Sequence, residues 1–411
     1  MSQRSDSERT ERVARRPLDR GEPAEQPSQG QGMMDDARPL LPPGYAMPSP
    51  GGWWALLEPI DRMRRWQGRV LDALGLGPIE TPSRVVHSQP GVTLKVYGTA
   101  GDNGPVVLLV PAPIKCAYIW DLVPWASVVQ QCLRGGARVY LIQWERPGAV
   151  EQGFGLAEYA DRLLLDCLDA IAMEGGRAPA VVAGHSLGGT LVAIFSALHP
   201  ERVRGLILLG APLHFGPDVG ALDRLAAAVP SGLMDVSGNV PGSFLDLVSV
   251  LAFPIAFEAA RWADWVVSLP DLGALDTHLR VERWTFDEMP LAARLFREVV
   301  EALYREDRFL RGTLRVRGRR AAPDAITAPL LSVVDARCPI APPRSVLPFH
   351  LAVGSPERRL LWYEGDTGVA LRHLGMLVGR SAHRRLWPEI VRWIRALGEP
   401  AREGDWRDGT G

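Results

Sequence analysis

The sequence has few of the residues that cross-link small secreted proteins or hold structural metals. Its 411 residues include four cysteines, which are scattered along the chain as Cys116, Cys132, Cys167 and Cys338. No two of them have the close spacing of a disulfide framework or a zinc site, so the pattern predicts free thiols in a reducing compartment and no metal centre. A folded interior must come from hydrophobic burial, for which 46% hydrophobic residues suffice.

Long hydrophobic runs and an excess of either charge are also missing. The longest apolar stretch, residues 247–257, contains Ser249 and Pro254 and is too short to cross a bilayer. The formal net charge of −1 gives no reason to expect a nucleic-acid partner. Lysine is nearly absent, since every basic residue except Lys95 and Lys115 is an arginine. The N-terminal segment lacks the apolar core of a secretion signal, so we expect a cytoplasmic protein.

The two ends of the chain differ in composition from the rest. Residues 1–50 are rich in Arg, Glu, Gln, Ser and Pro and hold one aromatic residue, Tyr45, so they cannot bury enough apolar surface to fold. We expect a disordered N-terminal tail over 1–50 and a flexible C-terminal tail over 401–411.

Residues 51–80 have the spacing of an amphipathic helix that leads into the folded domain. Its apolar positions are Trp54, Leu57, Ile60, Met63, Trp66, Val70 and Leu74. Such a stripe serves either of two purposes, packing on the core or docking on a lipid or polyester surface. We expect core packing.

Strand-like and helix-like stretches alternate through most of the remaining sequence. The strands are expected at residues 83–87, 92–97, 106–110, 138–144, 180–183, 206–209, 330–334 and 359–363, and the helices at 120–134, 156–173, 191–198 and 383–397. Such alternation predicts an α/β fold with a mostly parallel central sheet flanked by helices. The order of elements is that of an α/β-hydrolase. We expect its core over 81–211 and 326–400 and a helical cap, inserted between strands, over 212–325.

The sequence Gly184-His185-Ser186-Leu187-Gly188 follows an apolar strand and precedes a helix of small residues. Gly-x-Ser-x-Gly in this context is typical of a nucleophile elbow, in which a sharp turn raises the serine hydroxyl above the sheet. Side chains at Gly184 and Gly188 would collide across that turn. The sequence therefore predicts Ser186 as the nucleophile and the N–H of Leu187 as an oxyanion donor.

A second oxyanion donor is expected from the loop after residues 106–110. Pro111 and Pro113 have no N–H, so either Ala112 or Ile114 must donate, and we favour Ala112. His185 beside the nucleophile is expected to be structural.

Several longer motifs resemble one family, the polyhydroxyalkanoate synthases. The likeness spans roughly residues 81–397 and is carried by the segments 110–122, 136–147, 188–200, 280–287, 296–312 and 371–379. The segments of the cap resemble the class III enzymes in particular. The resemblance implies acyl transfer from hydroxyacyl-coenzyme A thioesters to a polyester, with the substrate held on the nucleophile as an acyl-enzyme. It implies no cofactor, because coenzyme A enters only as part of the substrate.

The resemblance also implies roles for individual residues. His373 matches the family's histidine base, while Ser186 stands where the family usually has cysteine, and Cys338 stands at the place of the aspartate. A buried thiol cannot replace a carboxylate unless its pKa is strongly lowered. Among the other acids, Asp335 is our first choice as partner of His373, and Asp366 and Asp218 are the alternatives.

Three functions remain open from the sequence. The first is a synthase-like acyltransferase and the second is an esterase, thioesterase or depolymerase that passes the acyl group to water. Ser186 and Cys338 in place of the family's cysteine and aspartate favour hydrolysis, because an oxygen ester is a less activated acyl donor than a thioester. The similarity of the cap to the synthases favours acyl transfer, which is our first hypothesis. The third is a non-catalytic protein of the polyester granule, which would have no use for a strained elbow. A granule surface, a partner subunit and a homo-oligomer are the partners the resemblance suggests. Trp262, Trp265 and Trp284 are candidates to line an acyl channel.

Overall fold

A central twisted sheet carries the site. The computed structural model describes residues 54, 57–98, 104–175, 180–229 and 238–398. These residues all belong to the second of two compact units, Pro48–Gly411. The expected tails over 1–50 and 401–411 lie outside the described residues.

Among those residues, eight strands form the sheet in the order β1-β2-β6-β3-β7-β8-β11-β12. Their bounds are β1 (Ser83–Gln89), β2 (Val92–Tyr97), β3 (Val106–Val110), β6 (Arg138–Trp144), β7 (Ala180–His185), β8 (Val203–Leu209), β11 (Leu330–Val334) and β12 (Arg358–Trp362). The pairs β1–β2 and β2–β6 are antiparallel and the others are parallel. The predicted α/β-hydrolase sheet is confirmed, with an antiparallel edge.

Helices cover both faces of the sheet, as its continuous apolar strands require. One face packs against α4 (Leu163–Met173) and α5 (Leu187–Leu198). The other packs against α3 (Val128–Arg134), α12 (Arg372–Val378) and α13 (Trp387–Gly398). Shorter elements complete the core: η2 (Glu151–Gly153), η3 (Glu158–Arg162), η4 (Pro200–Arg202), η8 (Pro323–Ala325), α11 (Pro343–Ala352) and η9 (Ala382–Leu386).

The helix expected over 120–134 begins eight residues later than predicted, at Val128. The preceding residues form η1 (Ala117–Trp120) and a short hairpin of β4 (Asp121–Val123) and β5 (Ala126–Ser127). The buried Asp121 carboxylate accepts hydrogen bonds from Thr81 N at 2.7 Å and from Ser127 Oγ at 2.5 Å. Because these bonds satisfy the carboxylate only in an extended chain, they override the helical pattern.

A helical insertion follows β8, within the range expected for the cap. It contains α6 (Ala221–Ala228), α7 (Gly242–Ala252), η6 (Ile255–Ala259), α8 (Ala260–Ser268), α9 (Leu272–Thr285), α10 (Ala293–Glu298) and η7 (Val299–Arg305). The hairpin of β9 (Leu314–Val316) and β10 (Arg319–Ala321) lies inside the range 212–325, but it packs on α5 of the core.

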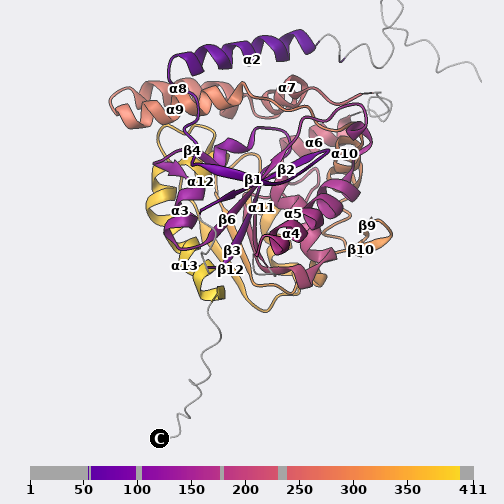
Figure 1. The fold of residues 1–411 in the computed structure, drawn as a ribbon. Coiled ribbons are helices and arrows are strands. Elements are labelled where there is room, and N and C mark those ends of the chain that lie inside the picture. Colours follow the sequence, from indigo (N-terminus) through magenta and orange to yellow (C-terminus); the bar gives the residue numbers. More distant parts are fainter. Residues whose placement is uncertain (1–53, 55–56, 99–103, 176–179, 230–237, 399–411) are drawn as a thin grey trace, which may run out of the picture. The chain divides into compact units, whose positions relative to one another are not determined.

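The lead-in helix α2 (Glu58–Ala73) packs on α7 and α9 with its polar side (Figure 1). Asp61 accepts a hydrogen bond from Ser243 N at 3.0 Å, and Asp72 pairs with Arg283 at 2.6 Å. Its apolar stripe points outward instead, with 59% of Trp66 exposed. The expectation that this stripe packs on the core is therefore wrong for most of its length, because charged groups of the cap hold the opposite side of the helix.

Other apolar side chains are exposed on α7, η6 and α8. We call the following set the outer apolar face: Ile60, Met63, Trp66, Val70, Leu74, Leu247, Leu251, Ile255, Trp262, Val266 and Val267. No single helix among the described residues has both the length and the apolar character to span a membrane. One bent pair, Gly242–Ala252 with Phe257–Ser268, meets both requirements together.

Candidate active site

Ser186 occupies a sharp turn between β7 and α5. Its backbone has φ 55° and ψ −132°, a conformation that non-glycine residues rarely adopt and that costs on the order of 1–3 kcal/mol. The turn is fixed on both sides, since Ser186 N donates to Leu209 O at 3.1 Å and Thr190 N donates to Ser186 O at 3.2 Å. A strained serine held this firmly at the end of a central strand has the backbone geometry of a nucleophile elbow.

The elbow glycines face backbone at very short range. A Cβ atom on Gly184 would lie 2.6 Å from Gly189 Cα, and one on Gly188 would lie 2.5 Å from the carbonyl oxygens of Val110 and Pro111. Real Cβ contacts do not reach such distances. The contact of Gly188 with Pro111 also brings the loop that carries Ala112 against the elbow.

Leu187 and Ala112, the expected oxyanion donors, line the same pocket as Ser186. Leu187 is the first residue of α5, where a backbone N–H has no partner within the helix. Trp144 Nε1 donates to Pro111 O at 2.7 Å and so holds the second loop in place.

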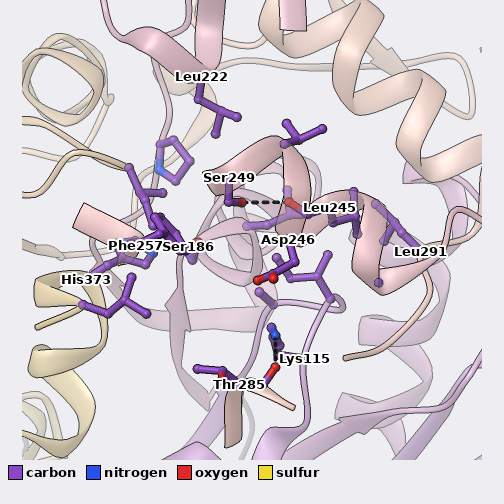
Figure 2. A pocket seen from close by; sticks show the side chains of 18 of the residues that line it. Lys115, Ser186, Leu222, Leu245, Asp246, Ser249, Phe257, Thr285, Leu291 and His373 are labelled. Carbon is purple, nitrogen blue, oxygen red and sulfur yellow. Dashed lines mark hydrogen bonds between the residues drawn. The ribbon is translucent and has the colours of Figure 1, made fainter. Parts of the chain in front are cut away.

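His373 lies in the first turn of α12 and is buried at the pocket wall. Its Nδ1 atom is 3.3 Å from Cys338 Sγ, and its Nε2 atom is buried without a hydrogen-bond partner among the described residues. Burial holds the pKa of His373 well below its ordinary value, with a smaller contribution from His185. The ring is therefore neutral near pH 7 and Nε2 is available to a group in the pocket. Figure 2 shows the His373 and Ser186 side chains on the same side of that pocket.

Asp335 does not reach His373, which corrects the sequence-based choice of acid. Its buried carboxylate pairs with Arg372 at 2.8 Å and accepts a hydrogen bond from Arg337 N at 2.8 Å. A turn after β11, closed by the bond from Cys338 N to Asp335 O at 3.1 Å, places Cys338 at the imidazole instead. Arg372 precedes His373 in the sequence, so the carboxylate is held by the neighbour of the histidine.

The two alternative acids are placed elsewhere as well. Asp366 accepts hydrogen bonds from Tyr363 Oη at 2.7 Å and from Ser381 N at 2.7 Å. Asp218 is exposed in the loop after β8. Neither has a hydrogen bond to His373 among the described residues.

Cys338 is a neutral partner for the imidazole. Burial raises the pKa of its thiol to about 11, although backbone N–H groups of Ala341 and Ile340 oppose this shift. Ala341 N donates to Cys338 Sγ at 3.4 Å. A neutral thiol accepts a hydrogen bond only weakly and cannot stabilise an imidazolium as a carboxylate does.

His185 contacts both the backbone and the ring of His373. Its Nε2–H donates to the backbone carbonyl of His373 at 2.8 Å, and the two ring centroids are 4.5 Å apart. Burial lowers the pKa of His185 to about 4, so the ring is neutral and its contact with the carbonyl oxygen fixes the tautomer.

The cavity in front of Ser186 has a volume of about 250 Å³ and a mostly apolar lining. The cap supplies much of that lining from α7 and its neighbours, for example Phe244, Val248 and Phe257. Of the three candidate tryptophans, Trp284 lines the cavity and donates from Nε1 to Cys116 O at 2.8 Å. Trp262 and Trp265 are not among the lining residues, and 69% of Trp262 is exposed.

Several charged side chains lie at another side of the cavity. The sequence patterns did not indicate them. Lys115 Nζ donates to Thr285 O at 2.7 Å (Figure 2), and Arg64 pairs with Asp246 at 3.2 Å and with Glu288 at 2.6 Å. No cluster of His, Cys, Asp and Glu within the described ranges is suited to hold a metal ion.

Comparisons with known proteins agree with the fold. A family model described as the alpha/beta hydrolase fold matches residues 105–237. The poly(3-hydroxyalkanoate) polymerase subunit PhaC of Haloarcula marismortui is 29% identical over 338 residues, which cover 79% of this chain and 70% of that protein. The corresponding subunit of Allochromatium vinosum is 26% identical over 345 residues, covering 82% of this chain and 96% of that protein.

Solved structures with a similar course of the chain are more distant. A monoacylglycerol lipase of Paleococcus ferrophilus superposes with a TM-score of 0.47 at 14% identity, over 74% of this chain and 99% of that one. A putative non-heme bromoperoxidase of Mycobacterium tuberculosis has a TM-score of 0.49 at 16% identity, over 76% and 98%.

Proposed function

We propose that this chain, a polyhydroxyalkanoate-synthase-like α/β-hydrolase, transfers hydroxyacyl groups from coenzyme A thioesters to a hydroxyl acceptor through an ester on Ser186. One observation carries the proposal. The strained Ser186 and the buried His373 line one apolar cavity, together with Leu187 and Ala112. Nucleophile, base and oxyanion donors are thus available to a single acyl group.

In the first half-reaction Ser186 Oγ attacks the thioester carbonyl while its proton passes to His373 Nε2. The N–H groups of Leu187 and Ala112 stabilise the negative charge on the carbonyl oxygen. The carbon–sulfur bond then breaks, and the proton on His373 leaves with the coenzyme A thiol. In the second half-reaction His373 removes the proton of the acceptor hydroxyl as that oxygen attacks the ester carbonyl. The bond to Ser186 Oγ then breaks, and the proton passes from His373 to Ser186 Oγ.

A second function, hydrolysis of the acyl-enzyme, is favoured by the nucleophile itself. Ser186 forms an oxygen ester, and passing its acyl group to an alcohol exchanges one oxygen ester for another. Water is in large excess over any alcohol acceptor. An esterase, thioesterase or depolymerase on the same residues is therefore the alternative.

One assay separates the two functions. Purified protein and its Ser186→Ala variant receive 3-hydroxybutyryl-coenzyme A, and released thiol, free acid and polymer are measured together. Thiol release with polymer supports the transferase, whereas thiol release with an equal amount of free acid supports the hydrolase. An unchanged rate in Ser186→Ala would contradict both.

We also propose that the outer apolar face docks on the surface of the polyester, which makes the protein granule-associated. Residues on the cavity side of α7 and α8, such as Phe244 and Arg261, line the pocket, while the other side of these helices is exposed. On α2 the exposed Arg62 and Arg69 flank the exposed Trp66, a composition suited to a helix lying at an interface. A product chain leaving the cavity would be close to the surface that binds it.

Docking is tested by sedimentation with polyhydroxybutyrate nanoparticles. The double variant Trp66→Ser/Trp262→Ser should lose most of the binding, and Trp284→Phe, inside the cavity, should retain it. The same surface could instead bind a second copy of this chain or a partner subunit, and light scattering without particles tests for the dimer. The polyester assignment would be overturned if the unmodified protein forms a dimer, or requires a partner subunit, and the double variant does not.

A further inference from the structure

A carboxylate of the cap is hydrogen-bonded to the loop that leads to His373. Asp264 on α8 accepts a hydrogen bond from Gly368 N at 2.9 Å on Oδ1 and one from Ala370 N at 3.1 Å on Oδ2. His278 Nδ1 lies 3.0 Å from the same Oδ2 and orients the carboxylate from α9. Both side chains are largely buried. The bonded backbone belongs to the loop between β12 and α12, three to five residues before the histidine.

The same loop is pressed against the cap from a second side. Gly368 has φ +84°, and a Cβ atom on it would lie 2.5 Å from the carbonyl oxygen of Ala274 on α9. Val369, the next residue of the loop, is buried in the hydrophobic core. The loop therefore has no room to shift toward α9 and is tied to α8 by two hydrogen bonds.

Two lining residues of the cavity lie close to this attachment along the chain. Arg261 precedes Asp264 by about one turn of α8, and Leu371 follows Ala370 directly; both line the cavity. A displacement of α8 by an acyl chain in the cavity would thus pull on Gly368 and Ala370. The loop leads without interruption into α12 and His373.

We propose that Asp264 is a positioning residue, which holds the His373 segment in its productive place and couples that place to the position of α8. The inference rests on the proposed role of His373 as the base. Because a displacement near 1 Å of a catalytic group costs about a hundredfold in rate, loss of this attachment should be visible in turnover rather than in substrate binding.

The test uses the full-length protein and a small activated ester, p-nitrophenyl butyrate, with active sites counted by a serine-directed fluorophosphonate. Asp264→Ala should lower kcat per active site by about tenfold to a hundredfold and leave KM within about twofold. Asp264→Asn retains one acceptor oxygen and should give an intermediate kcat. Gly368→Ala displaces the same loop from the side of α9 and should also lower kcat.

Asp276→Asn is the matched control. Asp276 lies on α9 and pairs with Arg280 at 3.0 Å, with no hydrogen bond to the His373 loop among the described residues, so its kcat should equal that of the unmodified protein. Three results would overturn the positioning role: an unchanged kcat per active site in Asp264→Ala, a raised KM with unchanged kcat, or a loss that only follows a lower melting temperature. His373→Ala separates this inference from the proposed function. Full activity in that variant would show that His373 is not the base, whatever the result for Asp264.

Discussion

Cys338 Sγ lies 3.3 Å from His373 Nδ1, where a Ser–His–acid triad has a carboxylate. For Ser186 to lose its proton, His373 must carry its own proton on Nδ1 and leave Nε2 free. A carboxylate favours this tautomer and stabilises the imidazolium that follows, whereas a neutral thiol does little of either. The site thus combines a nucleophile that depends strongly on its base with a base that lacks an anionic partner.

Replacing Cys338 with aspartate should activate the protein. The new carboxylate would face His373 Nδ1 and accept hydrogen bonds from the N–H groups that now point at the sulfur, such as that of Ala341. We expect kcat for a small ester to rise by about tenfold to a hundredfold in Cys338→Asp. Cys338→Ala is the control and should change kcat by no more than about threefold, since the lost bond to a neutral thiol is worth roughly 0.5 kcal/mol. Equal rates in the two variants would show that a carboxylate at residue 338 does not assist His373.

The activity should persist to unusually low pH. His373 must be neutral to act as a base, and burial lowers its pKa below 6.5, so protonation inactivates it only at more acidic pH. In a pH profile of kcat/KM the acid limb should lie below pH 6.5, and Cys338→Asp should move it to higher pH by stabilising the imidazolium.

Folding has to be followed across the same pH range. The pKa of buried His185 is about 4 against an ordinary 6.5, so its contribution to stability is complete above pH 6.5 and is lost as the pH falls through 4. Circular dichroism at each pH separates this loss from the titration of His373. An acid limb above pH 6.5 in folded, unmodified protein would contradict the assignment of His373 as the base.

Gly188→Ala should remove both activity and stability. The new Cβ atom would lie 2.5 Å from the carbonyl oxygens of Val110 and Pro111, so the loop carrying Ala112 must move away from the elbow. We expect the free energy of unfolding to fall by about 3 kcal/mol, measured in urea, with ester hydrolysis close to background. Gly153→Ala is the control, because a Cβ atom there meets nothing within 4 Å.

Ser186→Cys should change the product. A thioester on residue 186 is a better acyl donor to an alcohol than an oxygen ester, so the ratio of polymer to free acid formed from 3-hydroxybutyryl-coenzyme A should rise. The double variant Ser186→Cys/Cys338→Asp should raise it further. If both variants form only free acid, the nucleophile does not decide between transfer and hydrolysis, and the cap or the acceptor site does.

Local chemistry was sufficient for the sheet and for the elbow. The apolar runs fix the strands to within a few residues, because a fully buried strand admits little else. The glycines around Ser186 follow from the sterics of one turn, so the prediction needs no knowledge of distant residues. At Asp121 the same kind of reasoning was wrong, since a bond from Thr81, forty residues away, holds the chain extended.

The partner of His373 and the orientation of α2 were decided by tertiary structure. Sequence spacing could rank Asp335 first, but the turn after β11 presents Cys338 to the imidazole, and Arg372 holds the carboxylate. Likewise, helical periodicity determined which side chains of α2 share a face, and the ion pair of Asp72 with Arg283 determined that the polar face turns inward. The sequence pattern determines which side chains share a face of a helix or strand. What each face contacts depends on distant residues that only folding brings together.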